Sequence, residues 1–204
     1  QIVVELSNGN LFAMLVMIML ACIVLGMGLP STAAYVIAAA VGAPALLNAG
    51  IPALGANLFV FYFAIISFIT PPVAIASYAA AGLAGSNATK TGFIAFKLGI
   101  SGFIIPFFYI YHPGLLILGT GTWETVYAIV LAATAVIFIA ASFEGWVGIK
   151  LSLAERFALA VAAILLLTTN TSFNIAGFVI GSILMSIIAL RYKKNSFISK
   201  SGRF

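Results

Sequence analysis

Charged side chains are scarce in this sequence. They make up 6% of the 204 residues, whereas hydrophobic residues make up 64%. Soluble domains usually carry about 25% charged residues, so the composition excludes a water-soluble globular domain and indicates a protein whose solvent is lipid. In hydrocarbon an unpaired backbone N–H or C=O group costs several kcal/mol, which leaves helices and closed barrels as spanning structures. Long apolar runs without alternation of apolar and polar residues predict an all-α polytopic membrane protein.

Side chains suited to catalysis or metal binding are equally scarce. The chain has one His, His112, one Cys, Cys22, and four acidic residues, all of them Glu and all near the ends of apolar segments. These residues provide no nucleophile with a base, no carboxylate pair and no metal cluster, so we expect neither an enzyme nor a bound cofactor. The net charge of +5 comes from sparse Lys and Arg residues next to apolar segments, which is typical of topology signals rather than of nucleic-acid binding.

The apolar residues fall into six stretches, and the first two are each short for a membrane span of about 20 residues. These two stretches flank the sequence "GMGLPST", which contains two glycines, a proline and two hydroxyl residues. We interpret residues 11–49 as a re-entrant helical hairpin with this sequence at its tip, and residues 1–10 as a periplasmic connection before it. The stretches cover roughly residues 11–25, 33–49, 57–83, 93–118, 123–142 and 153–190.

A second interruption lies in the third stretch, which is long enough to cross the membrane but has "TPP" at its centre. Pro71 and Pro72 remove two backbone donors and disfavour helical geometry at the preceding residue. We therefore predict a discontinuous transmembrane helix over residues 57–83 that opens around Thr70.

The basic residues predict the topology. All nine Lys and Arg lie between predicted segments, in the first few residues of a segment or in the tail at residues 191–204, and the connections "HPGLLILGTGTWE" and "TTNTSFN" carry none. The positive-inside rule then places this tail in the cytoplasm. A transmembrane helix over residues 92–118 and additional C-terminal helices within residues 119–190 complete the predicted fold.

Two interruptions at membrane depth favour a binding site over a simple kink, because non-helical backbone is tolerated there only when it is buried in protein or lines a hydrated cavity. Secondary transporters use such backbone to coordinate Na⁺ through carbonyls and to hold anions at helix N-termini. The candidate ion ligands are the carbonyls freed around Gly26, Gly28 and Pro72 and the hydroxyls of Ser31, Thr32 and Thr70. The candidate substrate contacts are Pro30, Ser31, Tyr35, Pro71 and Ser77.

Three sequences that follow one another in the chain resemble a known family. They are "GMGLPSTAAYVIAAAVGAPAL", "NAGIPALGANLFVFYFAIISFITPPVA" and "AAGLAG…TGFIAFKLGISGFIIPFFYIYHPGLL". Together they are similar to the C-terminal part of the large membrane subunit of tripartite ATP-independent periplasmic (TRAP) transporters. The similarity is greatest to the form in which the small and large membrane subunits are fused. It covers about residues 10–118, and the residues after 120 fit the extra C-terminal helices of fused members.

The resemblance implies an elevator-type, Na⁺-coupled carrier for organic anions such as dicarboxylates or keto acids, fed by a periplasmic substrate-binding protein. It maps the family's second hairpin tip onto residues 26–32. Its second discontinuous helix maps onto residues 70–74, which adds Ala74 to the ion-binding positions. Many family members carry Gly where this chain has Ala74. The resemblance also implies a location in the inner membrane of a bacterial or archaeal cell. The further partners it implies are the lipid bilayer, a small membrane subunit, and a first half of the same permease before Gln1.

Two alternative classes fit the same composition. Another ion-coupled elevator carrier, such as a dicarboxylate/sodium symporter, would have similar interruptions, but a Ser-Asn-Thr tip would favour it and this tip reads Pro30-Ser31-Thr32. A non-transporting structural membrane subunit is the other alternative, and it would leave two adjacent interruptions unexplained.

Overall fold

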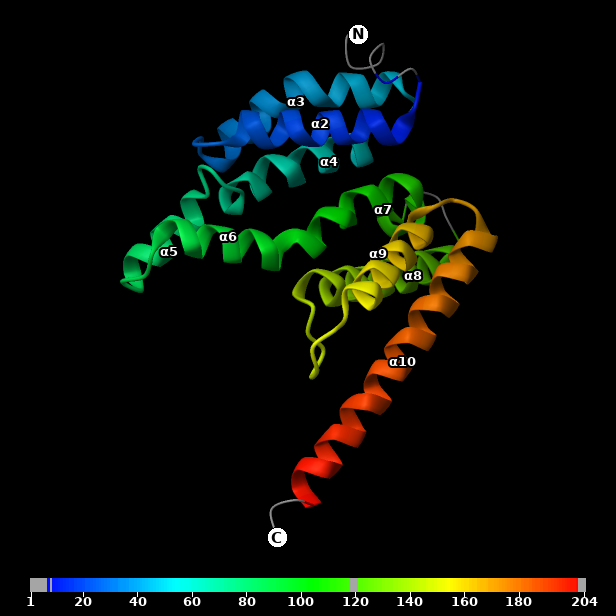
Figure 1. The fold of residues 1–204 in the computed structure, drawn as a ribbon. Helices are drawn as coiled ribbons and strands as arrows, with labels where there is room; N and C mark the ends of the chain where they lie inside the picture. Colours follow the sequence, from blue (N-terminus) through cyan, green and yellow to red (C-terminus); the bar gives the residue numbers. More distant parts are fainter. Residues whose placement is uncertain (1–6, 8, 118–120, 202–204) are drawn as a thin grey trace. The chain divides into compact units, whose positions relative to one another are not determined.

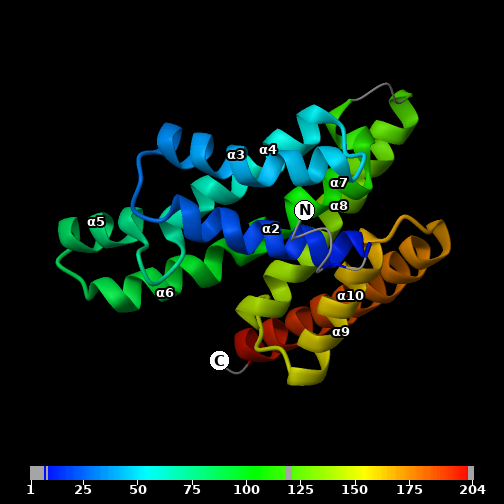
Figure 2. The ribbon, with the colours of Figure 1, turned by 90° about the horizontal axis from the view of Figure 1, so that it is seen from above.

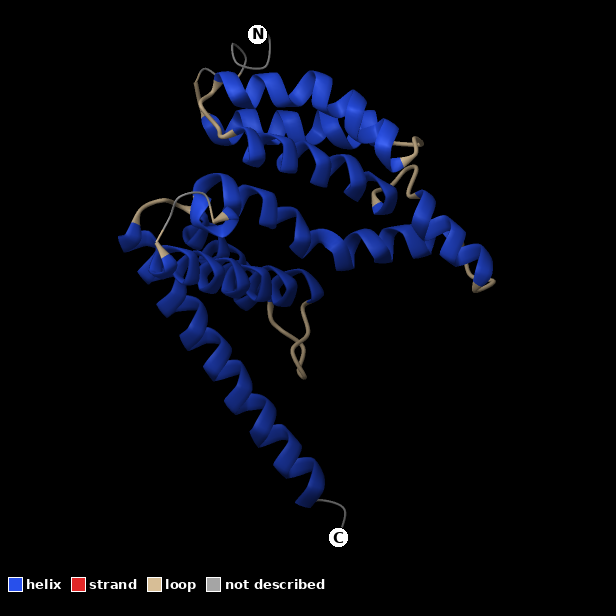
Figure 3. Cartoon of the chain, turned by 180° about the vertical axis from the view of Figure 1, so that it is seen from behind, coloured by secondary structure: helices blue, strands red, loops and turns tan. Residues whose placement is uncertain are grey.

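The computed structural model describes residue 7, residues 9–117 and residues 121–201 (Figure 1). The described residues form helices and no strand, apart from one isolated bridge between Trp146 and Lys150 (Figure 3). Four of these helical segments are long and apolar enough to cross a membrane, namely Ser31–Asn48, Ala88–Tyr111, Thr122–Glu144 and Thr171–Lys193. The structure thus confirms the predicted all-α polytopic membrane protein. The chain divides into two compact units, Gln1–Gly99 and Ile100–Phe204.

In the first unit, helices α2 (Leu11–Gly26), α3 (Ser31–Asn48) and α4 (Ala53–Ile66) pack side by side (Figure 2). The Asn10 side chain caps α2 by accepting a hydrogen bond from the backbone N–H of Ala13 at 3.1 Å. Pro30 and Pro52 directly precede α3 and α4, where a fixed backbone φ favours the start of a helix. The core between the three helices consists mainly of Leu15, Ile18, Cys22, Ala34, Ala38, Leu46, Ala56, Phe59 and Phe63.

The chain is non-helical only at residues 27–30 of the tip, a shorter segment than the predicted 26–32. Gly26 is the last residue of α2, and Ser31 and Thr32 belong to the first turn of α3. The predicted boundary was wrong at its C-terminal side because Pro30 allows helical geometry to begin at the next residue.

The second interruption separates α4 from α5 (Ile75–Leu83). A short 3₁₀ turn, η1 (Ser67–Ile69), ends α4, and residues 70–74 are non-helical. Helix α6 (Ala88–Gly99) follows α5 and packs against it.

The second unit begins with η2 (Ile100–Ile104), α7 (Ile105–Tyr111) and η3 (Pro113–Leu116). The predicted helix over residues 92–118 is therefore wrong in two respects: a 3₁₀ segment interrupts it, and its α-helical part ends at Tyr111. Three longer helices follow, α8 (Thr122–Glu144), α9 (Leu153–Leu167) and α10 (Thr171–Ser201). Helix α9 packs against both of its neighbours through buried small residues such as Ala162 and Ala163.

Two predicted end segments differ from the structure or fall outside it. The tail at residues 191–204 does not begin as a separate segment, because α10 continues without interruption to Ser201. Most of the predicted connection at residues 1–10 lies outside the described residues, as do residues 118–120 and 202–204.

His112 ends α7 and is half-buried, with its ring stacked on Phe108 at a centroid distance of 5.8 Å. Its Nε2 atom is buried and has no hydrogen-bond partner among the described residues. Burial lowers the pKa of His112, and backbone groups of Leu166, Leu167 and Thr168 oppose this shift in part. The folded protein therefore favours the neutral imidazole.

We expect acidification to destabilise the protein through His112. Below the ordinary histidine pKa of about 6.5, the unfolded chain binds a proton on this side chain more readily than the folded chain does. The stabilising contribution of the neutral ring is thus complete above that pH and is lost as the pH falls. The melting temperature of the detergent-solubilised permease should drop between about pH 8 and pH 5, and the drop should be smaller in His112→Gln. Equal drops in both proteins would contradict this assignment.

Candidate functional site

The hairpin tip and the interruption after α4 lie at the same end of the first unit (Figures 1 and 2). Gly26, at the C-terminal end of α2, lies directly against the residues where α4 ends. A Cβ atom at this position would lie 2.6 Å from the carbonyl oxygen of Ala64 and 2.8 Å from Oγ of Ser67. Only glycine permits this approach, so the sequence at Gly26 determines how closely the two interruptions meet.

The tip itself presents polar groups at an exposed surface. Gly28 has a φ of +81°, and open space surrounds the position of its missing Cβ. Ser31 and Thr32 are exposed in the first turn of α3, which has no side-chain cap. Uncapped backbone N–H groups at a helix N-terminus attract negative charge.

The hydroxyl groups at the end of α4 are buried and hydrogen-bonded to the helix backbone. Ser67 Oγ donates to the carbonyl of Ala64 at 2.6 Å, and Thr70 Oγ1 donates to the carbonyl of Ile66 at 2.8 Å. Because each hydroxyl uses its proton in this bond, its oxygen lone pairs remain available to a cation or to another donor.

The backbone of the interruption turns sharply after two prolines. The Pro71–Pro72 peptide bond is cis, and Ala74 adopts the left-handed conformation with φ 35° and ψ 45°. Ala74 is fully buried. The left-handed region costs a non-glycine residue roughly 1–2 kcal/mol, so the position has the geometry that glycine would adopt most easily.

The carbonyl of Pro72 already has a partner. The Tyr78 hydroxyl donates to it at 2.7 Å, which leaves one acceptor site on an oxygen that the sequence predicted to be free. Gly92 of α6 lies against the Tyr78 ring, because a Cβ there would be 2.8 Å from its Cε1 atom. The sequence did not predict this bond, because it depends on the turn of the chain between Pro72 and Tyr78.

The predicted substrate contacts lie in different environments. Ser77 is 5% exposed, and its Oγ has no hydrogen-bond partner among the described residues. The Tyr35 hydroxyl donates to Oδ1 of Asn57 at 3.1 Å, so Tyr35 links α3 to α4. Asn57 was missed, although an amide in an apolar stretch was a usable signal. Pro30 is exposed, and Pro71 is partly exposed.

The tip and the interruption lie in a stretch of sequence without charged side chains, and Lys90 and Lys97 follow it on α6, which packs against α5 and η1. The sequence from Leu6 to Thr89 contains no Asp, Glu, Lys, Arg or His, and the described residues contain no group of three possible metal-binding side chains.

A cavity of about 540 Å³ lies beside α4 and η1, but none of the predicted ligands lines it. Its lining consists of Phe61, Tyr62, Ile65, Ile66, Phe68, Ile69 and Gly99. The structure thus brings together Gly26 with Ser67 and Pro72 with Tyr78, and it does not gather all predicted ligands around that cavity.

The fold and these interruptions define a helical, multi-pass membrane protein with two polar breaks at one end of its first unit. The family model of the tripartite ATP-independent periplasmic transporter, DctM component, matches residues 1–123. The chain belongs to this family, and is therefore a membrane permease component of a TRAP transporter in the inner membrane. Membership implies a periplasmic binding protein and a small membrane subunit as partners. Comparisons with curated proteins and with solved structures gave no significant match.

We expect Gly26→Ala to destabilise the permease by roughly 1–3 kcal/mol, because the new methyl group would overlap a backbone carbonyl that cannot rotate away. Gly82→Ala is the matched control. Gly82 lies in helix α5 with nothing within 4 Å of the new Cβ, so this change should leave stability equal or raise it by up to about 1 kcal/mol. Thermal unfolding in detergent measures both effects. Equal stability of the two variants would show that the contact at Gly26 is not close.

Proposed function

We propose that this part of the permease couples the uptake of an organic anion to Na⁺ through the hairpin tip and the interruption after α4. The observation that supports this most is the concentration of oxygen dipoles in a stretch of sequence, from Leu6 to Thr89, that contains no charged side chain. The anion would be a dicarboxylate, a keto acid or a similar compound delivered by the periplasmic binding protein. The carrier would move its binding site as an elevator within the bilayer.

The proposed Na⁺ ligands are neutral oxygens. They comprise carbonyls around Gly26, Gly28, Pro72 and Ala74 and the hydroxyls of Ser31, Thr32 and Thr70. The carbonyls of Pro72 and Ala74 each accept one hydrogen bond from Tyr78 and would offer their second acceptor site to the ion. Thr70 fits this role because its hydroxyl proton is directed to the Ile66 carbonyl, which leaves oxygen lone pairs for a cation. Na⁺ is a hard cation and prefers such oxygen ligands.

The absence of a nearby carboxylate gives the coupling a physical cause. The charge of a Na⁺ ion bound here is left for the substrate anion to neutralise, so each ligand improves the electrostatics of the other. Such reciprocal coupling is typically about 1–3 kcal/mol. Ser77, with its buried and unpartnered hydroxyl, is the substrate contact that the structure supports best. Pro30, Ser31, Tyr35 and Pro71 are the other proposed contacts.

We expect Thr70→Val to weaken the Na⁺ dependence of uptake, because it removes one oxygen at nearly constant volume. Thr134→Val is the matched control: Thr134 Oγ1 donates to the carbonyl of Val130 at 2.7 Å, the same type of bond, in α8 of the other unit. The assay is uptake by the complete reconstituted permease with its binding protein across a Na⁺ titration. The half-saturating Na⁺ concentration should rise for Thr70→Val alone. Uptake that is equally fast without Na⁺, or an unchanged half-saturation, would contradict the proposal.

We also propose that the C-terminus lies in the cytoplasm, as the distribution of basic residues predicts. A reporter that is active only in the cytoplasm should be active when fused after Phe204, and a reporter that requires the periplasm should be silent there. The opposite pattern would reverse the topology and the side from which the hairpin enters the membrane.

A further inference from the structure

Basic and aromatic side chains gather at one end of the second unit. The connection between α8 and α9, the start of α9 and the region of α10 around residue 192 all contribute to this group. We call it the basic platform, and it consists of Trp146, Lys150, Arg156, Arg191, Tyr192 and Lys193.

The connection between α8 and α9 has a defined fold. Gly145 ends α8 in a left-handed conformation, and the backbone N–H of Leu151 donates to the Gly145 carbonyl at 2.9 Å. Gly148, with φ +72°, lies under the ring of Tyr192, since a Cβ there would be 2.7 Å from its Cδ2 atom. The connection is therefore held against α10 at Tyr192, the residue between Arg191 and Lys193, and Trp146 and Lys150 pair on either side of Gly148.

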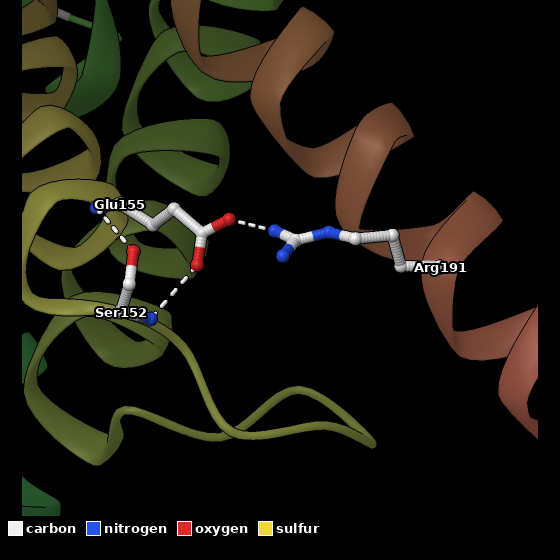
Figure 4. Close-up of polar contacts among 3 residues, drawn as sticks. All are labelled: Ser152, Glu155 and Arg191. Carbon is white, nitrogen blue, oxygen red and sulfur yellow. Dashed lines mark hydrogen bonds and ion pairs between the residues drawn. The ribbon is translucent and has the colours of Figure 1, made fainter.

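Two arginines connect α8, α9 and α10 at this end of the unit. Arg156 Nε donates to the carbonyl of Ser142 at 2.7 Å and Nη2 to that of Phe143 at 3.2 Å, so it caps the last carbonyls of α8. Glu155 forms a capping box with Ser152 and an ion pair with Arg191, which joins α9 to α10 (Figure 4). The platform is a fixed arrangement of three elements.

The platform keeps an excess of positive charge. Its four basic side chains are opposed by two acidic residues at the same end, Glu144 and Glu155. Lys150 and Lys193 are exposed and form no ion pair among the described residues. They are the side chains available to an external anion.

Two apolar helical segments end at the platform. Span Thr122–Glu144 ends where the connection begins, and the apolar run of α10 ends at Leu190, directly before Arg191, although the helix continues to Ser201. Exposed apolar side chains adjoin it, including Leu153 at 81% exposure and Leu190 at 68%. Trp146 is also exposed, and indole rings prefer the interface between hydrocarbon and headgroups. We therefore expect the basic side chains to lie at the depth of lipid phosphates.

We propose that the basic platform binds the phosphate headgroup of an anionic phospholipid in the adjacent leaflet. Lys150 and Lys193 contact the headgroup, while Trp146 and Tyr192 lie between it and the acyl chains. Charge complementarity and the position at two span ends favour a lipid over an acidic protein, because the exposed surface next to the platform is apolar. The bound lipid would join the α8–α9 connection to α10 at the membrane surface.

The test is lipid binding to the complete, delipidated permease in detergent, measured by native mass spectrometry with phosphatidylglycerol and with phosphatidylcholine. The unaltered protein should retain phosphatidylglycerol preferentially, and retention should fall as the salt concentration rises. The pair Lys150→Gln and Lys193→Gln should weaken phosphatidylglycerol binding about thirtyfold, since each basic residue near an anionic surface contributes about one factor of five. The pair Lys150→Arg and Lys193→Arg should restore it.

The pair Lys90→Gln and Lys97→Gln is the matched control, because it removes the same charge from exposed positions on α6 of the other unit. This pair should bind phosphatidylglycerol like the unaltered protein. An equal loss in both pairs, equal retention of the two lipids, or salt-independent binding would overturn the proposal. If the platform pair kept its lipid but lost the small membrane subunit on purification, the platform would be a protein-docking surface and the lipid proposal would be wrong.

Discussion

Every backbone polar group inside a bilayer needs a partner, and this requirement governs the first unit. The interruption after α4 removes helical partners over residues 67–74, in a region where the sequence has no charged side chain. Hydroxyl groups replace some of the missing interactions: those of Ser67, Thr70 and Tyr78 donate to the carbonyls of Ala64, Ile66 and Pro72, respectively. Polar backbone thus remains at this end of the unit without the desolvation penalty of a buried charge.

The two units use polar side chains differently. In the first unit, the hydroxyl of Tyr35 and the amide of Asn57 connect α3 to α4. In the second unit, the charged groups of Glu155, Arg156 and Arg191 connect helices in addition to the neutral bond from the Asn174 amide to the Tyr127 hydroxyl. These charged side chains are tolerated because they lie at the ends of the apolar runs of the sequence, where we expect water and lipid headgroups to solvate them.

Composition and helix-breaking residues made much of the fold predictable. The scarcity of charge indicated a helical membrane protein, and Gly28, Pro71 and Pro72 marked both interruptions. The extent of each element was harder to predict. Helix α3 begins earlier than expected, directly after Pro30. Helix α10 continues past Arg191 because residues 191–201 contain no Gly or Pro. The bond from Tyr78 to the Pro72 carbonyl was not predictable, because it requires a turn whose geometry no local pattern specifies.

Ala74 shows how packing determines the geometry of the interruption. Alanine disfavours the left-handed conformation by roughly 1–2 kcal/mol, yet Ala74 adopts it and is fully buried. Contacts with neighbouring residues offset this conformational cost. The N–H of Ala74 donates to the Thr70 carbonyl at 3.1 Å, and its carbonyl accepts from the N–H of Tyr78 at 3.0 Å. Gly92 of α6 leaves room beside the Ala74 methyl group. A strained residue held by so many contacts gives the backbone on either side of it a fixed direction. Thr70 and Ser77 are therefore positioned before any ligand binds, which reduces the ordering that ion binding would otherwise require.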